Sequence, residues 1–394
     1  MSSHIPEIDK VDQNALSPRR AIVGPIAAYI AFVMELTLVP LLLPTIQAQF
    51  GLAIGELAWV FNSYGVAVAV GVLLGGFCGD AFNIRRVFAL GVAFFAAGSV
   101  LVVTAHSFEA LIIGRALQGF GGGIFSPLVP ILLTQAAPHR PGKMLIFWGS
   151  IAGYVAALAP LFYGRLLSGH GWNLAFISIA TMAFIALVFL SRRQDDAIPA
   201  QFSGTPTRYS ELFRSRNLWV TFVYVFCTYG SITYYLFRLP IWLSVNAVNA
   251  ASVGFALSVL WITFSGLSTF LRNMVDKPYV FTIMLAAPFL IFAGFPLSYF
   301  NENALVLALS SVLVGAGLAC SNAPSTQLIL RFAPEGMSAI STSLDITFAR
   351  LGGIATVAVL AEVEIAYVIP AMCILCFIAA ICALTTRKGL LGAS

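Results

Sequence analysis

The segment AIVGPIAAYIAFVMELTLVPLLLP, residues 21–44, decides the class of this protein. It is almost wholly apolar, and it contains a single charged side chain, Glu35. About 20 consecutive apolar residues are enough for a helix to cross the hydrocarbon core of a bilayer. The segment is therefore predicted to span a membrane. A carboxyl group inside such a span is costly, so Glu35 is a candidate functional residue.

The composition of the whole chain supports a membrane protein. Hydrophobic residues make up 59% of the sequence and charged residues 9%, whereas a soluble domain carries about 25% charged residues. We predict an all-α integral membrane fold with twelve transmembrane helices, at residues 21–44, 56–79, 86–105, 108–133, 143–166, 173–190, 217–241, 251–271, 279–299, 303–330, 337–360 and 365–386. We expect no cleavable signal peptide, because the first 20 residues are polar and charged.

The basic residues predict the orientation. All but four of the 21 Lys and Arg residues lie in the tails or in alternate loops, on one side of the predicted membrane. Because basic loops remain in the cytoplasm, both termini are predicted to be cytoplasmic, in the plasma membrane and, for a bacterium, in the inner membrane. The four exceptions lie in or near spans: Arg115, Arg165, Arg238 and Arg350.

The chain also contains a parallel internal repeat. GFGGGIFSPLVPILLTQAAP (119–138) aligns with GAGLACSNAPSTQLILRFAP (315–334) six spans later. Parallel duplication of six helices is a recurring plan of secondary transporters, with the substrate site between the halves. The predicted organisation is a cytoplasmic tail at 1–20, a six-helix half at 21–190, a cytoplasmic linker at 191–216, a second six-helix half at 217–386 and a cytoplasmic tail at 387–394.

Three motifs make the chain resemble the major facilitator superfamily. GGFCGDAFNIRR (75–86) is similar to the family's loop motif, with matches at Gly76, Asp80, Arg85 and Arg86. The resemblance implies a latch on the cytoplasmic side, weakened here because Ala81 and Ile84 replace basic residues. Asn83 replaces a glycine of the motif and can also adopt a left-handed turn. The alternative is a solvated turn whose arginines only orient the chain.

LIIGRALQGFGGG (111–123) resembles the family's span-4 motif through Arg115, Gln118 and Gly119. The alternative reading of Arg115 is a structural or snorkelling arginine. GSIAGYVAALAPLFYG (149–164) is similar to the span-5 motif of the antiporter branches through Pro160 and Gly164, with other residues at two of the expected glycines. A lone proline kink would give much the same pattern.

MELTLVPLLLPTIQAQFG (34–51) resembles the first span of proton-coupled drug antiporters, through Glu35, Thr37 and the sequence PTI. The resemblance therefore implies a secondary transporter rather than an enzyme, which exports a drug-like molecule or natural product in exchange for protons by alternating access. Its partners would be the lipid bilayer, the substrate and protons, with no nucleic acid. Its energy source would be the proton gradient, without a cofactor, and it would be a monomer.

Helix rise places Glu35 and Arg115 at similar depth, about 10–13 Å below the outer surface. In the resembled fold, spans 1 and 4 line the central cavity, so we expect the two side chains to approach each other. A poorly hydrated site favours the protonated carboxyl, and a nearby arginine favours the ionised one. A substrate that alters their separation would load or unload a proton. The alternative is a permanently paired or protonated glutamate that only fixes packing.

Further candidates come from polar groups within spans. Asp345 is predicted either as a second proton-coupling residue or as a partner of a cytoplasmic loop. Arg350 and Asp345 do not share a helix face, because five residues turn a helix by about 500°. Arg238 is either a substrate contact or an interfacial charge. The candidate substrate-binding residues are Asn62, Tyr64, Gln118, Tyr229, Tyr234, Arg238 and Arg350, with Tyr235 beside them. The four histidines lie in the tail, loops or span edges, and no metal site is predicted.

Two other functions remain open from the sequence. One is uptake of a metabolite or organic anion by a symporter or uniporter, with Arg115, Arg238 and Arg350 binding a carboxylate. The other is a receptor or scaffold that transports nothing. Buried charges in both halves argue against the scaffold, which has no evident use for them.

Overall fold

The structure is a computed structural model that describes residues 18–136, 141–191, 212, 214–271, 279–300, 303–334 and 337–391. Within these ranges the chain is helical, without strands. The elements are α1 (Pro18–Phe50), α2 (Ile54–Ala81), α3 (Ile84–Val103), α4 (Phe108–Phe125), the short 3₁₀ helix η1 (Ser126–Leu128), α5 (Val129–Ala136), α6 (Pro141–His170), α7 (Asn173–Ser191), α9 (Arg216–Val245), α10 (Ala250–Leu271), α11 (Val280–Phe300), α12 (Ala304–Phe332), α13 (Ser338–Leu360) and α14 (Ile365–Leu391).

Twelve spans among the described residues are long and apolar enough to cross a membrane, which confirms the predicted number and order. Each predicted span overlaps the observed one over most of its length. The structure extends several of them, and α1, for example, continues to Phe50. Helix ends that remain regular beyond the apolar run satisfy their backbone hydrogen bonds internally, which apolar surroundings favour.

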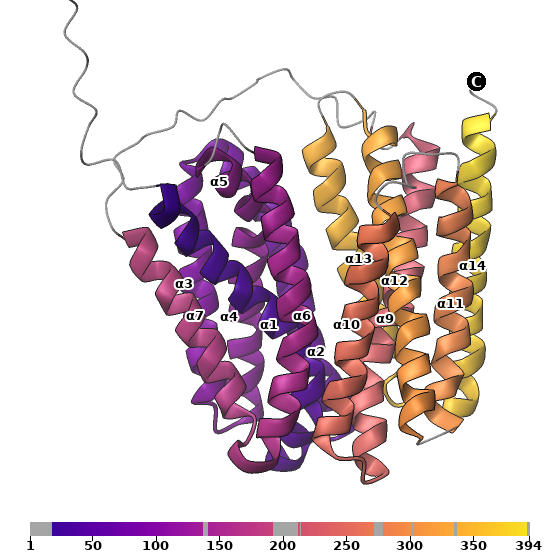
Figure 1. Cartoon of the computed structure of the whole chain (residues 1–394), viewed down its shortest axis with the longest axis horizontal. Coiled ribbons are helices and arrows are strands. Elements are labelled where there is room, and N and C mark those ends of the chain that lie inside the picture. Colours follow the sequence, from indigo (N-terminus) through magenta and orange to yellow (C-terminus); the bar gives the residue numbers. More distant parts are fainter. Residues whose placement is uncertain are drawn as a thin grey trace, which may run out of the picture.

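The helices form two six-span bundles that lie side by side, α1 to α7 in one and α9 to α14 in the other (Figure 1). We call them the N-terminal half and the C-terminal half. Helix α1 begins and α14 ends at the same end of the molecule, here called the terminal end, and the opposite end is the far end (Figure 1). The predicted linker between the halves falls mostly outside the described residues.

The fourth span is broken where the sequence predicted one continuous helix. Helix α4 ends at Phe125, η1 follows with Pro127, and α5 continues to Ala136. Proline has no backbone N–H and disrupts the regular hydrogen bonds of a helix, which accounts for the change of geometry at this point. The repeated segment in the second half stays within one helix, α12, although it contains Pro324.

Glycines in α4 bring the helices of the N-terminal half into backbone contact. A Cβ atom added at Gly119 would collide with the carbonyl of Tyr64 on α2. Because the position carries only hydrogen, α4 lies directly on α2. This contact holds Arg115, one turn before Gly119, against the centre of the bundle.

The two halves are closed against each other at the far end through α6 and α10. A Cβ added at Gly164 would lie 3.1 Å from the Cα of Gly254, and one at Gly254 would collide with the carbonyl of Pro160. Nearer the terminal end, a Cβ at Gly149 on α6 or Gly266 on α10 would meet nothing within 4 Å. The two helices therefore stay in contact from the far end as far as Gly153, where a Cβ would lie 2.9 Å from Oγ of Ser265. Beyond this point they diverge towards the terminal end (Figure 1).

Candidate functional site

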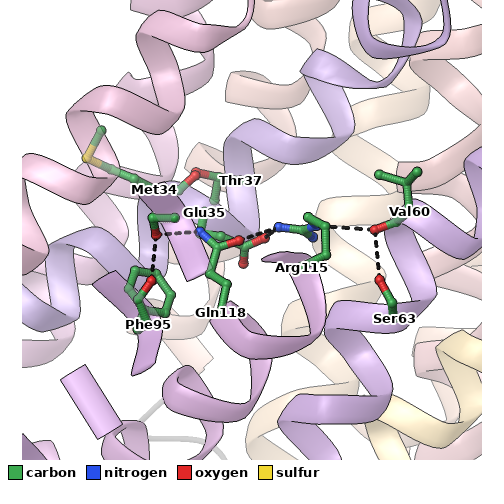
Figure 2. A network of polar contacts seen from close by, with 9 residues as sticks. Met34, Glu35, Thr37, Val60, Ser63, Phe95, Arg115 and Gln118 are labelled. Atoms are coloured by element: carbon green, nitrogen blue, oxygen red, sulfur yellow. Dashed lines mark hydrogen bonds and ion pairs between the residues drawn. The ribbon is translucent and has the colours of Figure 1, made fainter. Parts of the chain in front are cut away.

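Glu35 and Arg115 form a buried ion pair between α1 and α4. Each side chain is 1% exposed, and Nη1 of Arg115 donates a hydrogen bond to Oε1 of Glu35 (Figure 2). The expectation that these residues approach each other is confirmed. Burying a charge is very costly unless it is paired and hydrogen-bonded. Glu35 and Arg115 therefore each lower the cost of burying the other.

Arg115 is held by three neighbours besides Glu35. Its Nε donates to the carbonyl of Val60 on α2 at 3.1 Å, and its Nη1 donates to Oε1 of Gln118 at 2.7 Å. The guanidinium carbon lies 4.5 Å from the centre of the Tyr64 ring, and such cation–π contact is strongest where water is excluded. The arginine thus joins α1, α2 and α4.

Gln118 continues the network to α3. Its Nε2 donates to Oγ of Ser99 at 2.9 Å, and that hydroxyl donates to the carbonyl of Phe95 at 2.8 Å. Gln118 and Ser99 are both fully buried, so in this conformation the Gln118 amide is occupied by Arg115 and Ser99, and its role in substrate binding stays a prediction. Ser99 was not among the sequence candidates, because a single serine in an apolar span is common and gives no signal of its partner.

One oxygen of the Glu35 carboxylate remains free within the described part of the chain. Oε2 has no hydrogen-bond partner there, and neither has the hydroxyl of Tyr64, which is buried and interacts electrostatically with Glu35. The hydroxyl of Thr37 bonds to the carbonyl of Val33 in its own helix at 2.9 Å instead. The carboxylate can therefore gain a proton on Oε2 without losing its bond to Arg115.

The C-terminal half contributes a second polar cluster. Asp345 on α13 is 8% exposed and accepts a hydrogen bond from Oγ1 of Thr326 on α12 at 3.0 Å. Tyr229 on α9 donates to Oδ1 of Asn322 at 2.7 Å. Arg350 is half-buried and makes no hydrogen bond or ion pair with the described residues, although its charge acts on Tyr229. Asp345 thus bonds to a neighbouring helix, not to a loop of the described chain.

Two tyrosines of α9 are used inside the C-terminal half. The hydroxyl of Tyr234 donates to the carbonyl of Leu360 at 3.1 Å, and that of Tyr235 bonds to Oγ of Ser310 at 2.9 Å. Both rings are fully buried. Both hydroxyls are therefore occupied within the C-terminal half in this conformation, and their role in substrate binding stays a prediction. Arg238 is half-buried towards the far end of the same helix.

Asn62 joins the two halves. Its Nδ2 donates to the carbonyl of Ile354 on α13 at 3.2 Å, and its side chain is 2% exposed. Next to it, a Cβ at Gly65 would lie 3.2 Å from the Ile354 side chain. In this conformation Asn62 is an interface residue rather than a wall of an open cavity.

The loop motif after α2 is only partly described. The side chain of Asp80 lies outside the described residues, so the predicted latch stays a prediction. Gly76 lies within α2, Arg85 is half-buried and Arg86 is exposed. Asn83 does not use its capacity for a left-handed turn: its φ is −62°, and its Oδ1 accepts from the backbone N–H groups of Arg85 and Arg86. Asn83 instead caps the N-terminus of α3, a position that asparagine favours.

Histidine, cysteine and carboxylate side chains form no group of three or more that could hold a metal ion in the described chain. The polar groups that the fold does gather are the ion pair, Gln118, Tyr64 and, across the interface, Arg350. The arrangement places the carboxyl group of Glu35 beside the cation of Arg115, with the Arg350 cation on the facing half.

Comparison with known families decides the identity. A family model described as Major Facilitator Superfamily matches residues 26–357. The chain belongs to this superfamily. The superfamily resemblance inferred from the sequence is therefore confirmed, and the expectation that the chain is not an enzyme agrees with membership of a family of transporters.

Curated superfamily relatives include drug-resistance proteins. The multidrug resistance protein 3 of Bacillus subtilis (strain 168) is 29% identical over 192 residues, which are 48% of this chain and 37% of that protein. The puromycin resistance protein of Streptomyces alboniger is 33% identical over 199 residues, 48% of this chain and 39% of that protein. The tetracenomycin C resistance and export protein of Streptomyces glaucescens is 30% identical over 176 residues, which are 43% of this chain and 32% of that protein. The chain thus matches less than two fifths of these relatives' length.

Solved structures of the superfamily match the whole fold. A D-xylose–proton symporter aligns with a TM-score of 0.77 at 15% identity, covering 94% of this chain and 97% of that one. A nucleoside transporter aligns with a TM-score of 0.73 at 14% identity, covering 94% and 99%. At such identities the similarity establishes the fold alone.

Proposed function

We propose that this protein exports a small organic molecule in exchange for protons, by alternating access between its two halves. The observation that carries the proposal is the buried ion pair of Glu35 and Arg115 in the N-terminal half. Burial disfavours the ionised form of a carboxyl group and a neighbouring cation favours it, so a change in the separation of Glu35 and Arg115 would load or unload a proton. Proton exchange at Glu35 thereby changes the charge of the site by one unit.

The drug-resistance relatives support export as the direction and a bulky, partly apolar compound as the substrate class. The terminal end would face the cytoplasm, because the basic loops gather there. The structure would then represent a state closed to the outside by α6 and α10. Protons entering from the outside would exchange at Glu35 against substrate entering from the cytoplasm, and Asp345 would be a second proton-coupling residue.

The test is efflux driven by a pH gradient in proteoliposomes, with puromycin and ethidium as probes. Wild-type protein is expected to move a probe out against its gradient. Glu35→Gln should abolish this coupled transport, because an amide cannot exchange a proton. Equilibrative movement of the probe down its own gradient should remain.

Glu109→Gln is the matched control, since Glu109 is exposed in the first turn of α4, outside the network. It is expected to transport like the wild type. Coupled efflux by Glu35→Gln at the wild-type rate would show that Glu35 is not the coupling site.

One observation favours the alternative, uptake of an organic anion. Arg350 is a half-buried cation within a span, and it makes no ion pair with the described residues. A carboxylate substrate could pair with it. Uptake of a monocarboxylate that is lost in Arg350→Ala and kept in Arg387→Ala, at an exposed arginine near the end of α14, would support this function over export.

A further inference from the structure

Two buried polar atoms of the N-terminal half face each other without hydrogen-bond partners among the described residues. They are Oε2 of Glu35 and the hydroxyl of Tyr64. Tyr64 is 4% exposed, and its ring lies under the guanidinium of Arg115 at 4.5 Å. A buried hydroxyl without a partner is costly. A small movement would relieve the cost, because the hydroxyl can donate to Oε2 of an ionised Glu35 or accept from Oε2 of a protonated one.

The same hydroxyl is close to a charge from the other half. Arg350 on α13 interacts electrostatically with Tyr64, as Glu35 and Arg115 do. The position of Arg350 on α13 accounts for this interaction. Arg350 precedes Ile354 by four residues and so shares its helix face, and Ile354 is the residue that contacts Asn62 and Gly65 of α2. Arg350 therefore lies on the face of α13 that meets the N-terminal half.

The charged groups around this point come from three helices. Helix α1 supplies Glu35, α4 supplies Arg115, and α13 supplies Arg350 and Asp345. The titratable hydroxyls are Tyr64 on α2 and Tyr229 on α9, and Tyr229 interacts with both Asp345 and Arg350. With Glu35 ionised, the charge of Arg115 is balanced, and Arg350 faces a neutral pair. With Glu35 protonated, two unbalanced cations face each other through Tyr64.

We propose that Arg350, through Tyr64, transmits the protonation state of Glu35 to the contact between α2 and α13. Protonation of Glu35 leaves Arg115 and Arg350 repelling each other across the interface of the two halves. Like charges in a site that excludes water repel far more strongly than in water. The repulsion favours separation of α2 from α13, and loss of the proton favours the contact seen here. This inference rests on the proposed function of Glu35. It adds Arg350 as the residue through which the charge of Glu35 affects the contact between α2 and α13.

The experiment measures the distance between spin labels at the far end of the full-length protein in lipid nanodiscs. The labels replace Ala53, before α2, and Glu364, after α13, both exposed. Cys78 and Cys373 are first replaced by serine, because they are the native cysteines that are not buried. Glu35→Gln mimics the protonated residue, and it is expected to raise the population with the longer distance.

The effect of Glu35→Gln should depend on Arg350. In an Arg350→Gln background the increase should be lost, whereas Arg350→Lys should retain it, because lysine keeps the charge. Tyr64→Phe keeps the ring on Arg115 and removes only the hydroxyl, and it should reduce the increase. Tyr235→Phe is the matched control, since that hydroxyl bonds to Ser310 inside the C-terminal half. It should leave the increase unchanged.

An unchanged distance distribution in Glu35→Gln would overturn the inference, as would an increase of the same size with and without Arg350. Lowering the pH from 8 to 5 gives a second measurement with the native Glu35, in case the glutamine variant does not fold. The longer population should grow in the wild type and not in Arg350→Gln. Coupled efflux lost in Glu35→Gln with no change of distance would leave the proposed function standing and refute this link alone.

Discussion

Arg115 shows how one charged side chain can be accommodated in the interior of a membrane bundle. Its hydrogen bonds go to Glu35, Gln118 and the carbonyl of Val60, and Tyr64 covers its face. Replacing a buried pair by apolar groups is often tolerated, but removing one partner leaves an uncompensated charge. Arg115 and Glu35 should therefore be interdependent in stability.

We expect Arg115→Met to destabilise the protein by about 3–5 kcal/mol, because it leaves Glu35 buried without its cation. The double variant Glu35→Gln, Arg115→Met should be more stable than Arg115→Met alone, since it removes both charges. Thermal unfolding in detergent measures the difference. Arg86→Met, at an exposed arginine, should have little effect. A double variant no more stable than Arg115→Met would contradict the interdependence.

Among the helices, α4 has the strictest requirement for small residues. It lies between α2 and α3, and its glycines face the backbone of both: Gly119 meets Tyr64 on α2, and Gly121 meets Phe95 on α3. Small residues are enriched where membrane helices approach closely, because no hydrophobic effect drives their association in lipid. The positions of Arg115 and Gln118 follow from this close packing.

Alanine substitution at two helical glycines should change the stability of the protein in opposite directions. Gly119→Ala adds a Cβ that would overlap the Tyr64 carbonyl. We therefore expect the free energy of unfolding to fall by about 1–3 kcal/mol, because α2 and α4 must move apart. Gly149→Ala adds a Cβ with nothing within 4 Å, and alanine in a helix interior is more stable than glycine by up to about 1 kcal/mol. Thermal unfolding of both variants tests this. Equal changes of stability in the two variants would mean that α2 and α4 have room for a Cβ at Gly119.

For the molecule as a whole, the halves contact each other towards both ends. Towards the terminal end, a Cβ at Gly76 on α2 would lie 3.4 Å from Oγ of Ser343 on α13. Other contacts lie towards the far end. Asn62 bonds to Ile354, Gly164 meets Gly254, and a Cβ at Gly55 would collide with the side chain of Glu362. Alternating access requires such contacts to break when the site opens to the other side. The far-end contacts are therefore expected to be specific to this conformation.

A disulfide between Gly55→Cys and Glu362→Cys should lock this conformation. A Cβ at Gly55 lies 3.7 Å from Cγ of Glu362, close to the position that a cysteine sulfur would take, as a disulfide requires. Oxidation is expected to stop coupled efflux, and reduction should restore it. Each single cysteine variant, oxidised in the same way, is the control. Transport by the cross-linked protein at the unlinked rate would show that the far end does not need to open.

The depth of Glu35 and Arg115 could be predicted because a helix rises regularly, and a span begins and ends where its apolar run does. The break in the fourth span was missed, because a proline can either kink a helix or be absorbed in it, as in α12. The conformation of Asn83 could not be chosen from the sequence for a related reason. Asparagine suits both a left-handed turn and a helix cap, and the choice depends on the helix that follows.

The sequence by itself determined that the chain lies in a membrane, how many spans it has and which superfamily it resembles. It also predicted the approach of Glu35 to Arg115. Each of these follows from hydropathy, regular helix rise or a contiguous motif, which are local properties of the chain. Only the tertiary structure decided that Gln118 binds Ser99, that Asn62 reaches Ile354, and that the Tyr234 hydroxyl is used internally. These contacts join different helices, so they depend on how each helix is rotated about its own axis, and close packing against its neighbours sets that rotation.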